Sequence, residues 1–266
     1  MKSIEERDQA CIPGRRLGPD DTFNFECHAS LECFNQCCRN LNLFLYPYDV
    51  LRLSRHLKIT TDAFIQEHVD VVLREDHHFP EVLLRMAANQ EHTCPFLTAQ
   101  GCRVYADRPD TCRTFPVEQG ARFDTVGGRT TAVNFFRPPD FCLGRHADKQ
   151  WNVRSWARDQ EAERHHEMTM RWAKMRSLFQ NDPWGAEGPQ GAKAKMAFMA
   201  TYNLDRFREF IFDSSFLKRF GIKPAMQSKL RANDRALLLF GFEWVQLCVW
   251  GIASQKIRPR PRNRER

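Results

Sequence analysis

The chain has 266 residues, of which 42% are hydrophobic and 27% are charged. This balance is ordinary for a soluble globular protein, and it excludes a disordered chain, a collagen-like repeat and a polytopic membrane protein. The length allows one large domain or two modest ones with a sizeable core. Two features are unusual, a formal net charge of +7 and ten cysteines.

The N-terminal half is predicted to contain short elements joined by loops. We expect residues 1–26 to be an irregular N-terminal segment, because prolines and glycines interrupt any regular hydrophobic period there. Pro47 is pre-set for the first position of a helix, and Thr60 is a suitable N-cap for a second one. The best strand candidates are residues 81–87 and 130–136, which are short and rich in branched or aromatic side chains.

The C-terminal half is predicted to be helical. Residues 151–179 have the pattern of one long helix, and we expect its apolar stripe to belong to the core rather than to a cofactor site. The stripe consists of Met168, Trp172, Met175 and Phe179. Asn203 and Asp234 are predicted to cap two later helices. The last helix runs to about residue 253. It is short for a membrane span and carries Glu243, so a buried core helix is the better interpretation.

These elements predict an α+β fold that is mainly α. Residues 1–150 are expected to be an irregular cysteine-cluster, metal-binding domain with short strands, and residues 151–255 a helical subdomain. Residues 256–266 are predicted to be a disordered basic tail, since arginines alternate with prolines there. The tail supplies +5 of the net charge, which leaves about +2 for the rest of the chain. We therefore expect neither nucleic acid nor a membrane as a partner, and the sequence indicates no particular protein partner.

The compartment decides how the cysteines are interpreted. The N-terminal residues are charged and include no apolar segment of a secretory signal, so a cytoplasmic location is expected. In a reducing cytoplasm, clustered cysteines act as metal ligands or redox groups more often than as disulfides.

Eight cysteines lie in proline- and glycine-rich loops between residues 27 and 142. Thiolates are soft anionic ligands that suit Zn²⁺ and iron–sulfur clusters, so we predict a metal site. Eight thiolates match two four-ligand sites, or one site with redox or spare cysteines. The adjacent pair can bind one ion only in a sharp turn, and otherwise serves two centres. The predicted metal ligands are Cys27, Cys33, Cys37, Cys38, Cys94, Cys102, Cys112 and Cys142.

The remaining cysteines are expected to be bystanders. Cys248 lies on the apolar final helix, and Cys11 is isolated near the N-terminus. Three histidines lie close in sequence to predicted ligands and could each replace a thiolate, although a surface or hydrogen-bonding role is the simpler interpretation. These are His28, His92 and His146.

The central motifs resemble a bacterial cysteine-cluster family named for its CxxCxxCC signature, the YkgJ-like family, described as a zinc- or iron-chelating domain. The resemblance covers about residues 23–145 and is strongest in the segments 94–97, 101–105 and 108–116. The usual spacing of the first cysteines is C-x2-C-x2-C-C, whereas here the first two gaps are five and three residues. The family likeness implies a zinc or iron ligand.

A flagellin lysine methylase with a similar cysteine set links the resemblance to iron–sulfur chemistry, and favours a [4Fe-4S] cluster slightly over zinc. Two hypotheses follow, beside a third and less favoured one, a nucleic-acid-binding module that would depend on residues 256–266. The first is a metal-binding protein whose centre is at least structural, and the second is a redox or methyltransferase enzyme that uses an iron–sulfur centre. The sequence contains no recognisable catalytic motif, so an enzyme is not the first expectation. Arg108 and Arg113 flank Cys112 and could offset thiolate charge, fix the loop, or do both.

Overall fold

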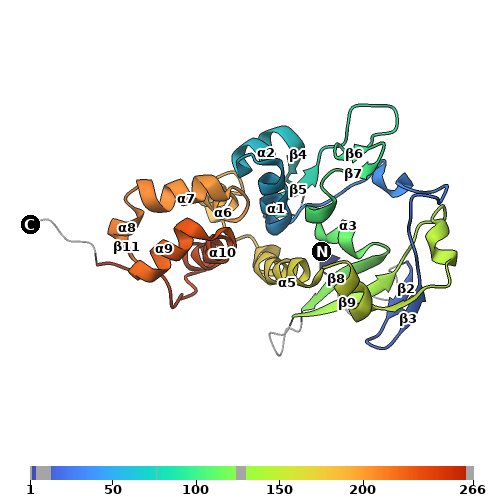
Figure 1. Cartoon of the computed structure of the whole chain (residues 1–266). Helices are drawn as coiled ribbons and strands as arrows, with labels where there is room; N and C mark the ends of the chain where they lie inside the picture. Colours follow the sequence, from blue (N-terminus) through green and yellow to red (C-terminus); the bar gives the residue numbers. More distant parts are fainter. Residues whose placement is uncertain (1, 4–12, 76, 124–129, 262–266) are drawn as a thin grey trace, which may run out of the picture. The chain divides into compact units, whose positions relative to one another are not determined.

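The computed structural model describes residues 2–3, 13–75, 77–123 and 130–261 (Figure 1). The chain divides into two compact units, each made from two stretches of sequence. Unit 1 comprises Met1–Leu45 and Leu83–Ser177, and unit 2 comprises Tyr46–Val82 and Leu178–Arg266. The architecture is α+β and mainly helical, as predicted. The domain boundaries predicted at residues 150 and 255 concern which parts fold independently, and they stay predictions.

Unit 1 is built around a four-stranded sheet in the order β1-β8-β9-β2. β8 and β9 form an antiparallel hairpin in which Val117 lies opposite Phe136. Two smaller antiparallel pairs, β3 with β10 and β6 with β7, carry the cysteine loops. The elements are β1 (Lys2–Ser3), β2 (Arg15–Leu17), β3 (Thr22–Asn24), the 3-10 helix η2 (Gln36–Cys38), β6 (Leu97–Thr98), β7 (Gly101–Cys102), η3 (Tyr105–Asp107), α3 (Asp110–Thr114), β8 (Val117–Phe123), β9 (Thr130–Phe136), η4 (Leu143–His146), β10 (Gln150–Asn152), α4 (Val153–Asp159) and α5 (Glu163–Ser177).

The core of unit 1 is aromatic and lies where β3 meets α4. Trp156 packs edge-to-face against Phe25 and Phe23, with ring centroids 5.4 and 6.2 Å apart. Cys142 belongs to the same buried cluster, with 6% of its surface exposed. Such aromatic contacts add to the free energy gained by burying apolar area. The N-terminal segment predicted to be irregular therefore contains short strands, because Phe23 has a hydrophobic partner on α4.

The single helix predicted over residues 151–179 is wrong. The segment instead begins with strand β10 and continues as helix α4. After a break, the helical structure resumes as α5. At the break Glu161 adopts a left-handed backbone conformation with φ of 51°. The carbonyl of Gln160 accepts a hydrogen bond from Arg113 over 2.9 Å, and its side-chain oxygen accepts one from Arg108 over 2.7 Å. Contacts with distant residues thus hold the chain where its own apolar pattern would continue a helix.

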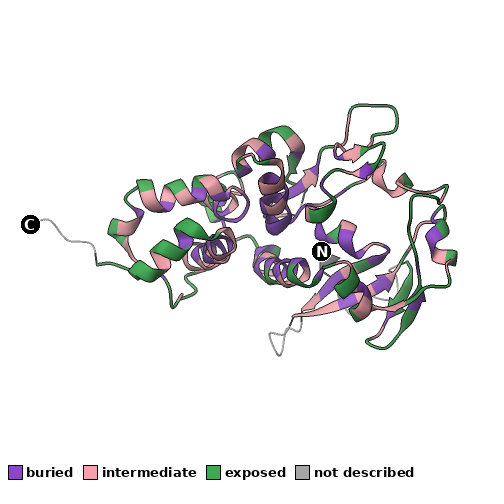
Figure 2. Cartoon of the chain, viewed as in Figure 1, coloured by how far each residue is buried: buried purple, intermediate pink, exposed green. Residues whose placement is uncertain are grey.

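Unit 2 is a helical bundle in which α10 packs on α6, α7, α9 and α1. Figure 2 shows buried faces on α1 and α10. Strand β5 spans the boundary between the units and pairs with β4. The elements are α1 (Pro47–Leu57), α2 (Thr61–His68), β4 (Val69–Val72), β5 (Glu81–Leu84), η5 (Leu178–Gln180), η6 (Gly185–Glu187), α6 (Ala192–Tyr202), α7 (Leu204–Asp213), α8 (Phe216–Arg219), β11 (Phe220–Gly221), α9 (Pro224–Ala232), α10 (Asp234–Trp250) and β12 (Arg258–Pro259).

The helix starts of unit 2 follow the predicted capping rules with one shift. Thr60 and Asn203 accept hydrogen bonds from the backbone N–H groups of Ala63 and Arg206, as expected for N-caps. The last helix is capped by Asn233 rather than Asp234, and it ends at Trp250 where Gly251 is left-handed.

The stripe residues Met168, Trp172, Met175 and Phe179 are all buried, which confirms their place in the core.

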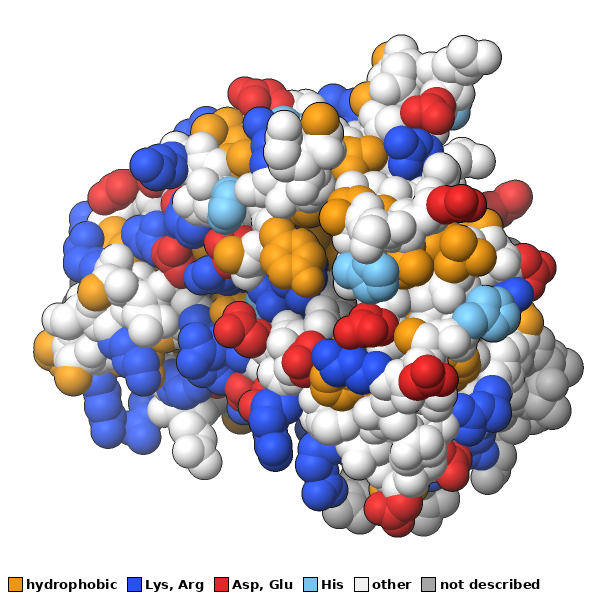
Figure 3. Space-filling view, turned by 45° about the vertical axis from the view of Figure 1, so that its right-hand side comes forward, with side chains coloured by type: hydrophobic (Ala, Val, Ile, Leu, Met, Phe, Trp, Pro, Cys, Tyr) orange, Lys and Arg blue, Asp and Glu red, His pale blue; other side chains and the backbone are white. Residues whose placement is uncertain are grey.

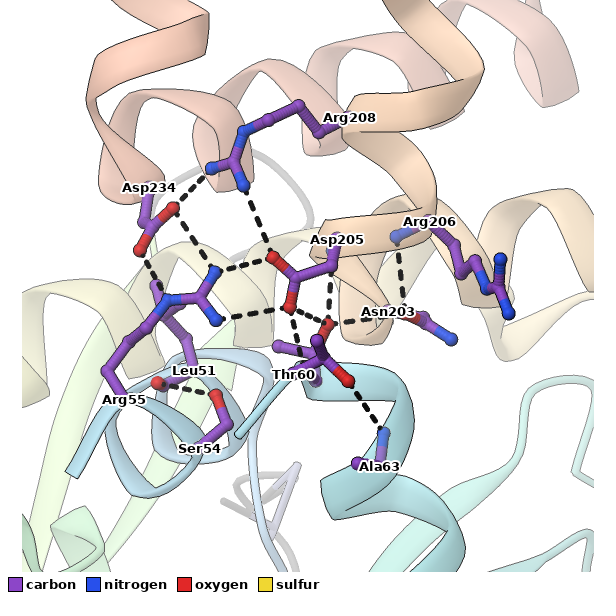
Figure 4. Close-up of polar contacts among 11 residues, drawn as sticks. Leu51, Ser54, Arg55, Thr60, Ala63, Asn203, Asp205, Arg206, Arg208 and Asp234 are labelled. Carbon is purple, nitrogen blue, oxygen red and sulfur yellow. Dashed lines mark hydrogen bonds and ion pairs between the residues drawn. The ribbon is translucent and has the colours of Figure 1, made fainter. Parts of the chain in front are cut away.

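The Asp234 carboxylate instead joins an ion-pair network with helices α1 and α7 (Figure 4). Arg55 binds Asp205 over 2.7 Å and Asp234 over 2.8 Å. Arg208 also contacts both carboxylates. Because each carboxylate has two cationic partners and each guanidinium has two anionic ones, the network neutralises its own charge.

The segment predicted to be a disordered tail is partly ordered. Of residues 256–261, Arg258 and Pro259 form strand β12, which pairs with β11. Ile257 is 1% exposed, and its burial explains why the chain stays on the protein there. Residues 262–266 and Cys11 lie outside the described residues.

Lys and Arg side chains are interspersed with Asp and Glu on the face drawn in Figure 3. Among the described helices, none is both long enough and apolar enough to cross a bilayer.

Candidate metal centre

All eight predicted ligands lie in unit 1, and the structure brings them near one another from four separate segments. None of the nine described cysteines is in a disulfide. By their backbone contacts and by the thiols that act on one another, they form two groups that are joined by a contact between Cys37 and Cys38. The first cysteine group is Cys27, Cys33, Cys37 and Cys142. The second cysteine group is Cys38, Cys94, Cys102 and Cys112.

The first group is assembled where the chain after β3 runs beside η4. The backbone N–H of Glu26 donates to the carbonyl of Gly144 over 3.1 Å, which places Cys27 next to the segment that contains Cys142. A side chain at residue 144 would clash, because a Cβ there would lie 2.4 Å from the Glu26 carbonyl oxygen. Glycine at this position therefore allows the two cysteine segments to approach closely.

Cys33 joins this group through its sulfur. The Sγ atom of Cys33 accepts a hydrogen bond from the backbone N–H of Leu143 over 3.3 Å. Consecutive turns between Cys27 and Cys33 accommodate the longer spacing, since Leu31 and Phe34 donate to the carbonyls of His28 and Leu31 over 3.1 and 2.8 Å. The unusual spacing thus still brings the first cysteines to one place.

The thiols of the first group repel one another when ionised. Partial burial of its sulfur, together with the neighbouring thiols Cys37, Cys142 and Cys33, raises the pKa of Cys27 to about 11, although the residue as a whole is exposed. Burial likewise raises the pKa of Cys142, with Cys33 and Cys37 adding to the effect. A cation among these sulfurs would relieve both effects.

The second group is assembled by pairing of the chain after Cys38 with the chain before Cys94. The backbone N–H of Cys94 donates to the Cys38 carbonyl over 2.8 Å, and Arg39 and Thr93 form a β-bridge. The tight β6–β7 hairpin then places Cys102 opposite Leu97, whose N–H donates to the Cys94 carbonyl over 3.0 Å. Two cysteines distant from η2 are thereby brought beside it.

Cys112 completes the second group from the short helix α3. This helix is anchored at Thr114, whose carbonyl accepts from the Trp156 indole over 3.0 Å. Arg113, which is buried, donates to the Gln160 carbonyl over 2.9 Å. Sequence reasoning missed these supporting roles of Trp156 and Gln160, and no local pattern in the sequence points to them.

Arg108 fixes its loop, as the sequence suggested, and lies close enough to Cys102 to act on that thiol. Its guanidinium lies 3.8 Å from the Tyr105 ring and donates to the Tyr105 carbonyl over 2.6 Å, which fixes the loop before Pro109. Burial raises the pKa of Cys102, and the positive charges of Arg108 and Arg103 oppose that rise. The arginines therefore hold the loop and favour the thiolate form of a candidate ligand.

Cys37 and Cys38 are the point where the two groups meet. They lie in the 3-10 helix η2, and their thiols interact. This contact lowers the pKa of Cys37 to about 7 and raises the pKa of Cys38. The thiols of Cys112 and Cys94 raise the pKa of Cys38 further, after burial and the contact with Cys37.

The thiol donors suit zinc or iron, although the described residues contain no group of three Cys, His, Asp or Glu side chains arranged to hold a metal ion. Soft sulfur donors, clustered closely enough to repel as anions, fit a soft or borderline cation. The other candidates have different surroundings. His28 contacts the Ser30 hydroxyl over 2.7 Å, and His146 lies 3.2 Å from the Arg145 guanidinium. Cys248 lies on α10 in unit 2, whereas both groups lie in unit 1.

Comparison with known proteins agrees with this donor set. A family model named CxxCxxCC and described as a putative zinc- or iron-chelating domain matches residues 26–142, a stretch that includes all eight cysteines of the two groups. No solved structure matches the chain. Residues 26–142 of this protein are thus similar to the CxxCxxCC family.

Proposed function

We propose that the protein is a metal-binding protein that chelates zinc or iron through the thiolates of the two cysteine groups. The observation that supports this most is the assembly of eight thiols from four chain segments into unit 1. Neighbouring thiols raise the pKa of Cys38 and of Cys142, and a cation bound among the sulfurs would oppose this by stabilising the thiolate forms that act as ligands.

The finer proposal is an iron–sulfur cluster. Four thiolates suit zinc and a [4Fe-4S] core equally well, so the preference comes from the resemblance to the flagellin lysine methylase. The second candidate function is accordingly a redox or methyltransferase enzyme that uses such a cluster. Free thiols as ligands require a reducing compartment, so we propose a cytoplasmic location.

In this proposal the chain's own residues prepare the site. The backbone contacts at Cys38 and Gly144 hold the thiols near one another before metal binds. Arg39, Arg103 and Arg108 place positive charge beside ligands of both groups, which favours deprotonated sulfur. The bound metal would tie together loops that are otherwise held by a few hydrogen bonds and by packing on Trp156.

Elemental analysis of the full chain, purified without oxygen, tests the proposal together with a UV–visible spectrum. We expect stoichiometric metal in the wild type and unchanged metal in Cys248→Ser, the matched control outside both groups. Brown protein with iron and acid-labile sulfide that bleaches with dithionite supports the cluster, and colourless protein with zinc refutes it. Protein that binds neither metal refutes the proposed function.

A further inference from the structure

The two cysteine groups are built on different parts of unit 1. The first group depends on the contact of the chain after β3 with η4, where Glu26 donates to the Gly144 carbonyl over 3.1 Å. The second depends on the pairing of Cys38 with Cys94, on the β6–β7 hairpin and on α3. In sequence the groups are interleaved, since Cys142 of the first follows Cys112 of the second.

We propose that the two cysteine groups are two separate metal centres of four thiolates each, and that Cys37 and Cys38 supply one ligand to each centre. This inference rests on the proposed metal-chelating function and adds the ligand set of each site. The first centre is Cys27, Cys33, Cys37 and Cys142. The second centre is Cys38, Cys94, Cys102 and Cys112.

The local backbone supports the division at Cys37 and Cys38. A 3-10 helix has three residues per turn, so neighbouring side chains in η2 leave the axis about 120° apart. The Cys37 side chain acts on Cys27 and Cys142, whereas the Cys38 side chain lies near Cys94 and Cys112. The contact between the two sulfurs is then a contact between neighbouring centres.

Coordination chemistry also favours two centres. Zn²⁺ and each [4Fe-4S] cluster take four thiolates, so a single centre would leave four of the eight thiols as unused neighbours. Each tetrathiolate centre would carry a net charge of about −2 with either metal. Both groups have a cation beside them, Arg39 for Cys37 and Arg108 for Cys102.

Double serine variants of the full chain test the ligand sets through the metal content per chain. We expect about half of the wild-type metal in two within-group variants, Cys27→Ser with Cys142→Ser and Cys102→Ser with Cys112→Ser. We expect almost no metal in the cross-group variant, Cys112→Ser with Cys142→Ser. This variant loses two thiols, as each within-group variant does, but it loses one from each centre. The single variant Cys248→Ser is the control.

Other outcomes overturn the inference in recognisable ways. If a within-group variant loses all metal, or if the cross-group variant keeps half, the ligand sets are wrong while the proposed function stands. A wild-type protein that binds no metal refutes the proposed function itself, and the two-centre inference with it.

A second measurement uses the wild-type protein, so that no variant needs to fold. Metal is withdrawn in steps with a chelator, and exposed thiols are alkylated and identified by mass spectrometry. We expect the four cysteines of the first group to react together and earlier, because Cys27 is exposed. The second group should react together afterwards. If Cys37 and Cys38 become reactive in the same step, with the same partners, the division between them is wrong.

Discussion

The backbone N–H of Cys94 donates to the backbone carbonyl of Cys38 over 2.8 Å. Beside this contact Asn40 donates to the His92 carbonyl over 3.0 Å, so the two cysteine segments are aligned over several residues. A metal bound by both cysteines would close a loop whose ends these hydrogen bonds already hold together. The contact therefore connects metal binding to the order of the backbone.

Metal removal should loosen this contact. When the metal is withdrawn with a chelator under reducing conditions, we expect the Cys94 amide to exchange its hydrogen about tenfold faster or more, because local opening no longer requires breaking metal–thiolate bonds. Hydrogen exchange followed by mass spectrometry measures this in peptides from residues 94–116. Peptides from α10 serve as the internal control. Equal protection with and without metal would show that packing alone holds the loops.

The Gly144 position offers a test of the first centre by sterics alone. In Gly144→Ala the new Cβ would meet the Glu26 carbonyl oxygen at 2.4 Å and the Phe25 ring at 3.0 Å, so the Cys27 and Cys142 segments must separate. We expect a loss of about 1–3 kcal/mol in the free energy of unfolding and of about half of the bound metal. Gly221→Ala is the matched control, since its Cβ would make only ordinary contacts, the nearest at 3.6 Å. Full metal content in Gly144→Ala would contradict the role given to this close approach.

What could be predicted from the sequence depended on local chemistry. Thr60 caps its helix, and strand β9 occupies the predicted residues 130–136, because hydroxyl capping and side-chain pattern act within a few residues. The break at Glu161 was missed because Gln160 is held by Arg108 and Arg113, whose proximity no local pattern records. The clustering of cysteines in the sequence was enough to predict a metal site. The division of Cys37 from Cys38 needed the backbone of η2 and the partners on each side.

The Arg55–Asp205 pair predicts how stability depends on pH. Burial alone would raise the pKa of Asp205, but hydrogen bonds from Arg55 and Thr61 outweigh it and lower the pKa to about 2. A carboxylate whose pKa is depressed in the folded state stabilises the protein above its unfolded pKa of about 4. That contribution, on the order of 2 kcal/mol, is lost as the pH falls from about 4 to 2.

Urea unfolding between pH 5 and pH 2.5, followed by tryptophan fluorescence, measures this contribution. We expect Asp205→Asn to be less stable than the wild type at pH 5 and to differ less from it at pH 2.5, because the wild-type carboxyl is then partly protonated. Asp213→Asn, an exposed residue at the end of the same helix, is the control. A constant difference between wild type and Asp205→Asn across this range would refute the electrostatic explanation.

Ile257 tests whether the C-terminal segment packs on unit 2. It is 1% exposed, whereas its neighbour Arg258 is exposed and pairs with Gly221 through the backbone. We expect Ile257→Ala to lower the free energy of unfolding by about 2–5 kcal/mol, the usual cost of truncating a buried aliphatic side chain. Arg258→Ala should change it by about 0.5 kcal/mol or less, because the side chain is in water and the strand pairing remains. Both values come from urea unfolding of the full chain at neutral pH. If Ile257→Ala unfolds at the same urea concentration as the wild type, residues 256–261 do not pack in solution and the disordered tail predicted from the sequence is the better description.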